Sequence, residues 1–223
     1  MATTNLIKPP PKPKNLKFVR AKFAYLAKES DELTFNEGDL LVVLDSTSDP
    51  AWWRAKCRGL EGFVPSNFLT SKTASEDMEA NPFHDACKRG NVALLEECLL
   101  NQVPVNVPDL AGNSGLHWAA RGGHEDVMER LVSLGPQLDV NLENRLGDGP
   151  IHLAARKGNK RCIELLRSTG RIDVRKPNKD GLTPYDLATD LDAKEALKLW
   201  MKESCNQDED IEYEKSEDEE DKP

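Results

Sequence analysis

The sequence predicts a multidomain protein in which a small all-β barrel is followed by an all-α repeat solenoid, with disordered segments at both ends. Three observations lead to this fold class. Residues 15–71 contain short apolar and aromatic runs separated by polar turns. From residue 81 onward a motif recurs about every 33 residues. The two ends of the chain are strongly biased in composition, one toward proline and the other toward acids.

Composition limits the classes of protein that fit. The chain has 223 residues, of which 31% are charged, and no apolar run approaches the roughly 20 residues of a membrane span. The N-terminus shows no signal-peptide core, because Leu6 and Ile7 are followed at once by Lys8 and prolines. The cysteines are scattered, odd in number and never in a CxxC pair, so we expect reduced thiols, a cytoplasmic location and no membrane insertion. They are Cys57, Cys87, Cys98, Cys162 and Cys205.

Residues 1–14 form a proline-rich leader that we expect to be disordered. Its run from Lys8 to Lys14 favours polyproline helix, which has no internal hydrogen bonds. The leader contains a PxxP at Pro10 and Pro13, so it could bind a polyproline-recognising groove, in cis or otherwise. The alternative, a solvated leader, remains open.

The barrel is organised around residues 51–69, where Trp52 and Trp53 are adjacent in a strand-like run. Neighbouring residues in a strand point to opposite faces, so one of the two indoles must face away from the core. An exposed tryptophan near a surface proline and other aromatics makes a shallow apolar groove. Such a groove suits a proline-rich peptide, because a polyproline helix loses little entropy on docking.

Residues 17–70 resemble an SH3 domain. The residues that carry the resemblance are an ALYDY-type motif at 21–25, the tryptophan pair and a PSNY-type motif at 65–68. The resemblance implies a peptide groove and an acidic pocket that pairs with an Arg or Lys of the ligand. The groove residues are Phe23, Tyr25, Trp52, Pro65 and Phe68, and the pocket residues are Glu29, Asp31 and Glu32, with Asp49 nearby.

Phe23 and Phe68 stand where the SH3 family usually has tyrosine. Each missing hydroxyl removes a possible hydrogen bond to a ligand carbonyl, worth about 0.5–1.5 kcal/mol net. We therefore expect the groove to bind peptides more weakly or more selectively than is usual for the family. The alternative is that these aromatic side chains belong to the core of the barrel.

Residues 72–80 lack apolar periodicity and are interpreted as a linker. After it, TPLH-like starts recur with offsets of 33 to 35 residues, each followed by a pair of small residues and, in the first three, a glycine break. A period of this length resembles ankyrin repeats, stacked pairs of helices. The repeats are expected over 81–203, at 81–107, 109–141 and 143–175, with a degenerate C-terminal cap at 178–203 in which Asp186 replaces the motif histidine.

The histidines do not indicate a metal site. His84, His117 and His152 recur at one position of the repeat, and in ankyrin repeats this histidine bonds within its turn and to the neighbouring repeat. His124-Glu125 begins like HExxH, but Met128 occupies the place of the second histidine. We find no catalytic constellation, so neither enzymatic activity nor a cofactor or metal is expected.

Equivalent positions of stacked repeats align, which places several cations side by side. Lys88, Arg121 and Arg156 each follow the small pair of their repeat, and Trp118 should lie beside them. These four residues are predicted to bind a second protein through an acidic and apolar segment, which the acidic tail could occupy in cis. The alternative is solvated helix ends with a tryptophan packed on its neighbour.

Residues 204–223 are expected to be a disordered acidic tail. Residues 208–223 contain ten acids and two lysines, so they carry −8 of the net charge of −9, and no general nucleic-acid surface remains. Ser216 precedes an acidic run and is a candidate phosphosite for an acidophilic kinase.

The order of these segments resembles a family of intracellular SH3–ankyrin adaptors that indirectly promote osteoclast formation and bone resorption. The resemblance implies a monomeric, non-enzymatic signalling adaptor that binds proline-rich signalling proteins through its SH3 groove and a second protein through its ankyrin face. The alternative is a regulatory or inhibitory subunit that grips a folded partner through the ankyrin repeats.

Overall fold

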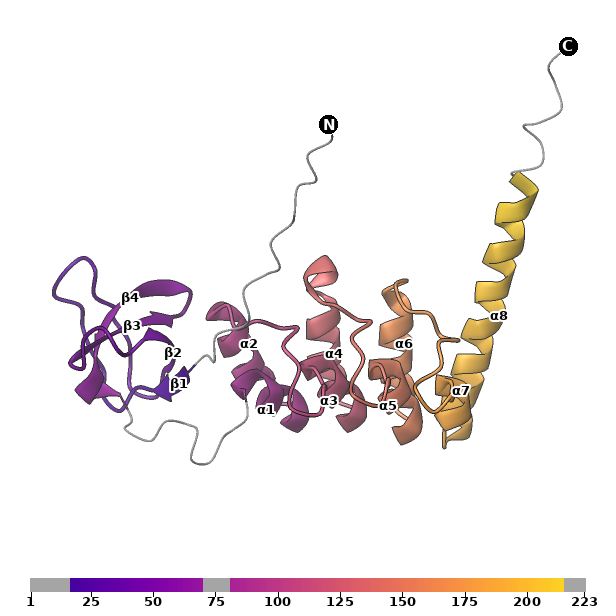
Figure 1. The fold of residues 1–223 in the computed structure, drawn as a ribbon, viewed down its shortest axis with the longest axis horizontal. Coiled ribbons are helices and arrows are strands. Elements are labelled where there is room, and N and C mark those ends of the chain that lie inside the picture. The colour runs from indigo at the N-terminus through magenta and orange to yellow at the C-terminus, as the bar shows by residue number, and fades with distance from the viewer. Residues whose placement is uncertain (1–16, 70–80, 215–223) are drawn as a thin grey trace, which may run out of the picture. The chain divides into compact units, whose positions relative to one another are not determined.

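The computed structural model describes residues 17–69 and 81–214, with side chains in the second range as far as Ser204 (Figure 1). The chain divides into two compact units, Met1–Glu79 and Ala80–Pro223. The predicted leader, linker and phosphosite at Ser216 lie outside the described residues. Within the described ranges, no helix is both long and apolar enough to cross a membrane.

The first unit is a four-stranded antiparallel sheet with strand order β1-β2-β3-β4. An isolated antiparallel bridge between Ala21 and Leu69 brings the end of β1 against the chain that follows the last strand. This arrangement confirms the predicted all-β fold. The elements are β1 (Lys17–Arg20), β2 (Leu40–Asp45), β3 (Trp52–Cys57), β4 (Leu60–Pro65) and a short 3-10 helix, η1 (Ser66–Phe68).

The alternation of β3 separates the core from the outer face of the sheet. Ala55 and Cys57 are buried, whereas Arg54 is exposed, because successive side chains of a strand point to opposite sides. Paired residues of antiparallel strands share a face, so Trp52 lies on the outer face with its partner Pro65, beside the pair Arg54 and Phe63.

The second unit consists of helix pairs stacked in two layers (Figure 1). One layer contains α1, α3, α5 and α7, and the other contains α2, α4, α6 and α8, each helix packing on the next in its own layer. This arrangement confirms the predicted repeat solenoid. The helices are α1 (Pro82–Arg89), α2 (Val92–Leu100), α3 (Gly115–Gly122), α4 (Glu125–Val132), α5 (Pro150–Lys157), α6 (Lys160–Ser168), α7 (Pro184–Leu187) and α8 (Leu191–Glu214).

Local chemistry sets the ends of these helices. Asn81 caps α1 by accepting a hydrogen bond from the Phe83 amide at 3.0 Å, and Pro82 occupies the first turn, where no donor is lost. The helix ends at Gly90, which has a φ of 70°, a left-handed conformation that glycine adopts without strain. Gly123 and Gly158 end α3 and α5 in the same way.

Helix α8 is longer than the predicted cap. It continues to Glu214, so the first part of the predicted disordered tail is helical. Ala193, Leu197 and Trp200 are buried and anchor the helix against the stack. Extending an anchored helix requires no new nucleation, and Glu and Lys have good helix propensity, which accounts for the extension.

Candidate functional site

The predicted groove residues of the first unit form a row of aromatic rings. The Trp52 ring centroid lies 6.2 Å from that of Tyr25, which lies 5.2 Å from that of Phe68. The Phe68 centroid lies 6.2 Å from that of Phe23. In each of these contacts the edge of one ring meets the face of the next. We call the four residues the aromatic ledge.

The tryptophan pair divides between the two faces of the sheet. Trp52 contributes to the ledge, whereas Trp53 packs against the core and carries the Lys17 ammonium 4.3 Å from its ring centroid. Phe23 is 50% exposed, so the ledge ends in an open apolar surface. Pro65 is buried and lies beside Trp52 as its cross-strand partner on the same face.

Glu32 is turned toward its own loop. One of its carboxylate oxygens, Oε2, accepts hydrogen bonds from the Tyr25 hydroxyl at 2.9 Å and from the amides of Lys28 and Glu29 at 2.6 and 3.2 Å. These bonds, with the Lys28 amide as the main cause, lower the pKa of Glu32. The same contact occupies the Tyr25 hydroxyl. Loss of solvation on burial, followed by the hydrogen bond to Glu32 and the charge of Glu32, raises the pKa of Tyr25. Glu32 therefore closes the loop that carries the acidic residues.

The other predicted pocket residues differ in their roles. Glu29 and Asp31 are exposed, and no side-chain partner of either carboxylate occurs among the described residues. Asp49 accepts hydrogen bonds from the amides of Ala51 and Trp52 at 2.7 and 3.4 Å, which caps the start of β3. The unengaged negative charge beside the ledge thus comes from Glu29 and Asp31.

Sequence reasoning missed Phe63 as a candidate groove residue. This side chain is 40% exposed and lies diagonal to Trp52 on the outer face of the sheet. The Phe63 amide donates to the Asp31 carbonyl at 2.8 Å, which fixes the acidic loop against β4. Strand alternation could have revealed it, since Phe63 is an even number of residues from Pro65 and so shares its face.

In the second unit, two of the predicted cations meet at Trp118. The Lys88 ammonium lies 5.0 Å and the Arg121 guanidinium carbon 5.6 Å from the Trp118 ring centroid. The indole N–H donates to Asp109 at 3.0 Å, which fixes the ring. Among the described residues, neither cation pairs with a carboxylate. We call Lys88, Trp118 and Arg121 the tryptophan patch.

Arg156 does not join this patch. Its guanidinium lies 3.0 Å from Oδ2 of Asp148, whose side chain is fully buried. That oxygen accepts no hydrogen bond from the described residues, so Arg156 compensates it by charge. The other oxygen, Oδ1, accepts a hydrogen bond from Asn178 at 2.8 Å. Arg156 therefore balances a buried carboxylate in the stack.

The motif histidines join parts of the repeats. His117 accepts from the Ser114 amide at 3.1 Å through Nδ1, while Nε2 contacts the Asp148 carbonyl of the next repeat at 3.0 Å. His152 makes the equivalent bonds to the Gly149 amide and the Lys176 carbonyl. Burial lowers the pKa of His84, His117 and His152, which favours the neutral ring.

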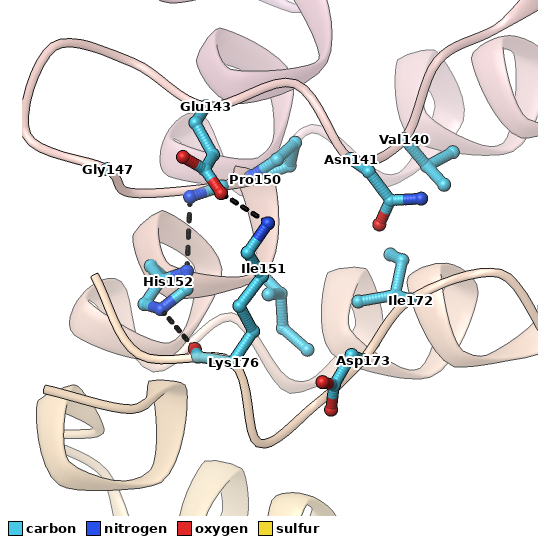
Figure 2. A pocket seen from close by; sticks show the side chains of 11 residues that line it. Val140, Asn141, Glu143, Gly147, Pro150, Ile151, His152, Ile172, Asp173 and Lys176 are labelled. Carbon is cyan, nitrogen blue, oxygen red and sulfur yellow. Dashed lines mark hydrogen bonds and ion pairs between the residues drawn. The ribbon is translucent and has the colours of Figure 1, made fainter. Parts of the chain in front are cut away.

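A small pocket lies beside His152 (Figure 2). Glu143 and Lys176 line it and form an ion pair, 2.5 Å apart, and the His152 ring bonds to the Lys176 carbonyl. The polar groups that Figure 2 shows joined by dashed lines are thus engaged with one another rather than directed into the hollow. No predicted site residue lines this pocket.

Comparison with known families agrees with both folds. Residues 20–66 match the SH3 domain model, and residues 83–132 and 116–167 match the model of ankyrin repeats. An SH3 domain followed by ankyrin repeats supports a protein-interaction adaptor.

Several curated relatives share this chain's sequence over 129 residues. Osteoclast-stimulating factor 1 of Danio rerio is 49% identical, and those of Monopterus albus and Gallus gallus are 46% and 45% identical. The matched region covers 56% of this chain and 58% to 62% of these relatives, less than two thirds of their length.

Proposed function

We propose that this chain is a non-enzymatic signalling adaptor whose aromatic ledge binds proline-rich peptides. The observation that carries the proposal is the continuous row of partly exposed rings from Trp52 to Phe23, bordered by the exposed acids Glu29 and Asp31. The rings offer the apolar ridges between which a polyproline helix packs, and the acids offer partners for a flanking Arg or Lys.

An NMR titration of the full chain with PxxP peptides that carry a flanking Arg tests the proposal. Binding should perturb the ledge residues, and Trp52→Ala should weaken it about 30-fold or more, as expected for a central aromatic anchor. Lys17→Gln is a matched control, because Lys17 lies over Trp53 on the core side. Absence of perturbation with every peptide would contradict the proposal.

A second protein is proposed to bind the ankyrin unit at the tryptophan patch. What supports this is that Lys88 and Arg121 are exposed, held against an aromatic ring and unpaired with any described carboxylate. The partner segment would be acidic and apolar. Charge reversal of both cations should abolish its capture, whereas Lys157→Glu, at the exposed end of α5, should not.

The alternative role, a regulatory or inhibitory subunit, makes a different prediction. If the ankyrin unit grips a folded enzyme or transcription factor, the patch variant would lose the main cellular partner while Trp52→Ala retains it. An adaptor that joins two partners would need both the aromatic ledge and the tryptophan patch to form the ternary complex.

By similarity to the osteoclast-stimulating factor relatives, we propose that the chain indirectly promotes osteoclast formation and bone resorption from the cytoplasm. The buried free thiols of Cys57, Cys87, Cys98 and Cys162 are consistent with a reducing compartment. Osteoclast counts in precursor cultures that lack this chain, re-expressing wild type or Trp52→Ala, test the role. Equal counts in all three cultures would contradict it.

A further inference from the structure

The two ends of the aromatic ledge carry opposite charge. At the Trp52 end, the loop with Glu29 and Asp31 is fixed to β4 by the bond from the Phe63 amide to the Asp31 carbonyl. At the other end, the Lys22 ammonium lies 5.2 Å from the ring centroid of Phe23. No carboxylate pairs with Lys22 within the described part of the chain, and Lys22 is exposed.

The backbone holds Lys22 at this position. Its amide donates to the Phe68 carbonyl at 2.7 Å, so the residue is tied to the ledge residue that contacts Phe23. A ligand that covers the exposed face of Phe23 must approach this ammonium. Partial desolvation of a cation is unfavourable unless an anion compensates it. A ligand carboxylate at this end would provide that compensation.

We propose that the ligand of this groove is a proline-rich peptide with a basic residue at one flank and a carboxylate at the other, the carboxylate being bound by Lys22. This inference rests on the proposed function and adds the charge pattern of the partner. The four rings, joined by contacts of 6.2, 5.2 and 6.2 Å, extend over at most about 18 Å. At ~3.1 Å per residue of polyproline helix, at most about six residues cover the row of rings between the two charged flanks.

The test uses the full chain and a set of peptides with one proline-rich core. Each peptide carries Arg at one flank and Glu, Gln or Lys at the other, and the set is made in both chain directions. Isothermal titration at low and high salt gives the affinities. For wild type at low salt, Glu should bind about 1.5- to 5-fold more tightly than Gln, the range of an exposed charge pair, and Lys more weakly. Salt should reduce the difference.

Variants assign the effect to one residue. Lys22→Gln should remove the preference for Glu, and Lys22→Glu should reverse it in favour of Lys. Lys17→Gln changes the net charge equally but acts over Trp53, so the preference should remain. Equal affinity of wild type for the Glu and Lys peptides, or a preference that survives Lys22→Gln, would overturn this inference alone. Failure of every peptide to bind, the Gln peptide included, would overturn the groove itself and this inference with it.

Discussion

In the SH3 unit the aromatic side chains stand at the surface while nearby polar groups hold loops, whereas in the ankyrin unit several polar side chains are buried between repeats and bond from one repeat to the next. Glu32 and Asp49 fold back on their own loops, which leaves the ledge apolar. In the second unit Asp148 and His117 are fully buried and serve the stack. One unit therefore uses polarity to shape a surface, and the other uses it to join repeats.

The sharpest way to test this difference is Arg156→Ala. Removal of the guanidinium leaves the buried Asp148 carboxylate without its charge partner. Breaking a fully buried pair costs about 3–5 kcal/mol, and because Arg156 is 39% exposed we expect about 2 kcal/mol. Urea unfolding followed by circular dichroism at the helix band measures it.

Arg121→Ala is the matched control for Arg156→Ala, since Arg121 is the equivalent residue of the preceding repeat, and its guanidinium lies over the Trp118 ring with no carboxylate partner among the described residues. It should cost less than about 1 kcal/mol. Adding Asp148→Asn to Arg156→Ala should recover part of the loss. Equal destabilisation by the two arginine variants would contradict the buried-pair role.

The second largest difference between the two units should appear in how their stability depends on pH. The pKa values of His84, His117 and His152 are lowered by burial, so the unfolded chain binds protons first as the pH falls. The stabilisation is complete above the unfolded value of about 6.5 and is lost as the pH drops below it toward the folded values. The slope is about 1.4 kcal/mol per pH unit for each histidine that titrates.

Residues 17–69 contain no histidine, so the SH3 unit should not share this loss. Thermal unfolding at pH 7 and pH 5.5, with each unit followed by NMR, distinguishes the two. A parallel loss of stability in both units would show that the buried histidines are not its cause.

A smaller effect is expected from restoring hydroxyls to the ledge. Phe23→Tyr and Phe68→Tyr each offer a donor to a ligand carbonyl, worth about 0.5–1.5 kcal/mol, or roughly a 2- to 12-fold gain in affinity for a PxxP peptide. Calorimetric titration measures it. Unchanged or weaker binding by both variants would show that the hydroxyls have no carbonyl within reach.

The smallest effect on binding is expected from Tyr25→Phe. Because the Tyr25 hydroxyl already donates to Glu32, its removal should change peptide affinity less than about 2-fold. The pKa of Glu32 should rise, since one donor to its carboxylate is lost. NMR titration of the Glu32 carboxyl carbon follows this. A large loss of affinity would place the hydroxyl on the ligand instead.

The sequence predicted both folds and the members of the aromatic ledge because their motifs are local and periodic. It could not predict the direction of the Glu32 carboxylate, which depends on how the loop closes around residues 28 and 29. Alignment of the repeats predicted that Arg156 lies beside Arg121. Instead, the Arg156 side chain pairs with Asp148, an acid at a position where the neighbouring repeats have Asn113 and Leu182. The length of α8 was missed because acidic composition was interpreted as disorder, although its anchor lies upstream.

The bonds between repeats limit how this array could grow. Asn106 reaches the Gln137 carbonyl, and Asn141 reaches the Arg171 carbonyl of the following repeat. At the equivalent place in the last full repeat, Arg175 donates to the Met201 carbonyl in α8 at 2.9 Å. A gene duplication that inserted a copy of residues 109–141 after itself would carry its own connectors. A copy added after residue 175 would instead follow Arg175, whose carbonyl partner lies in α8.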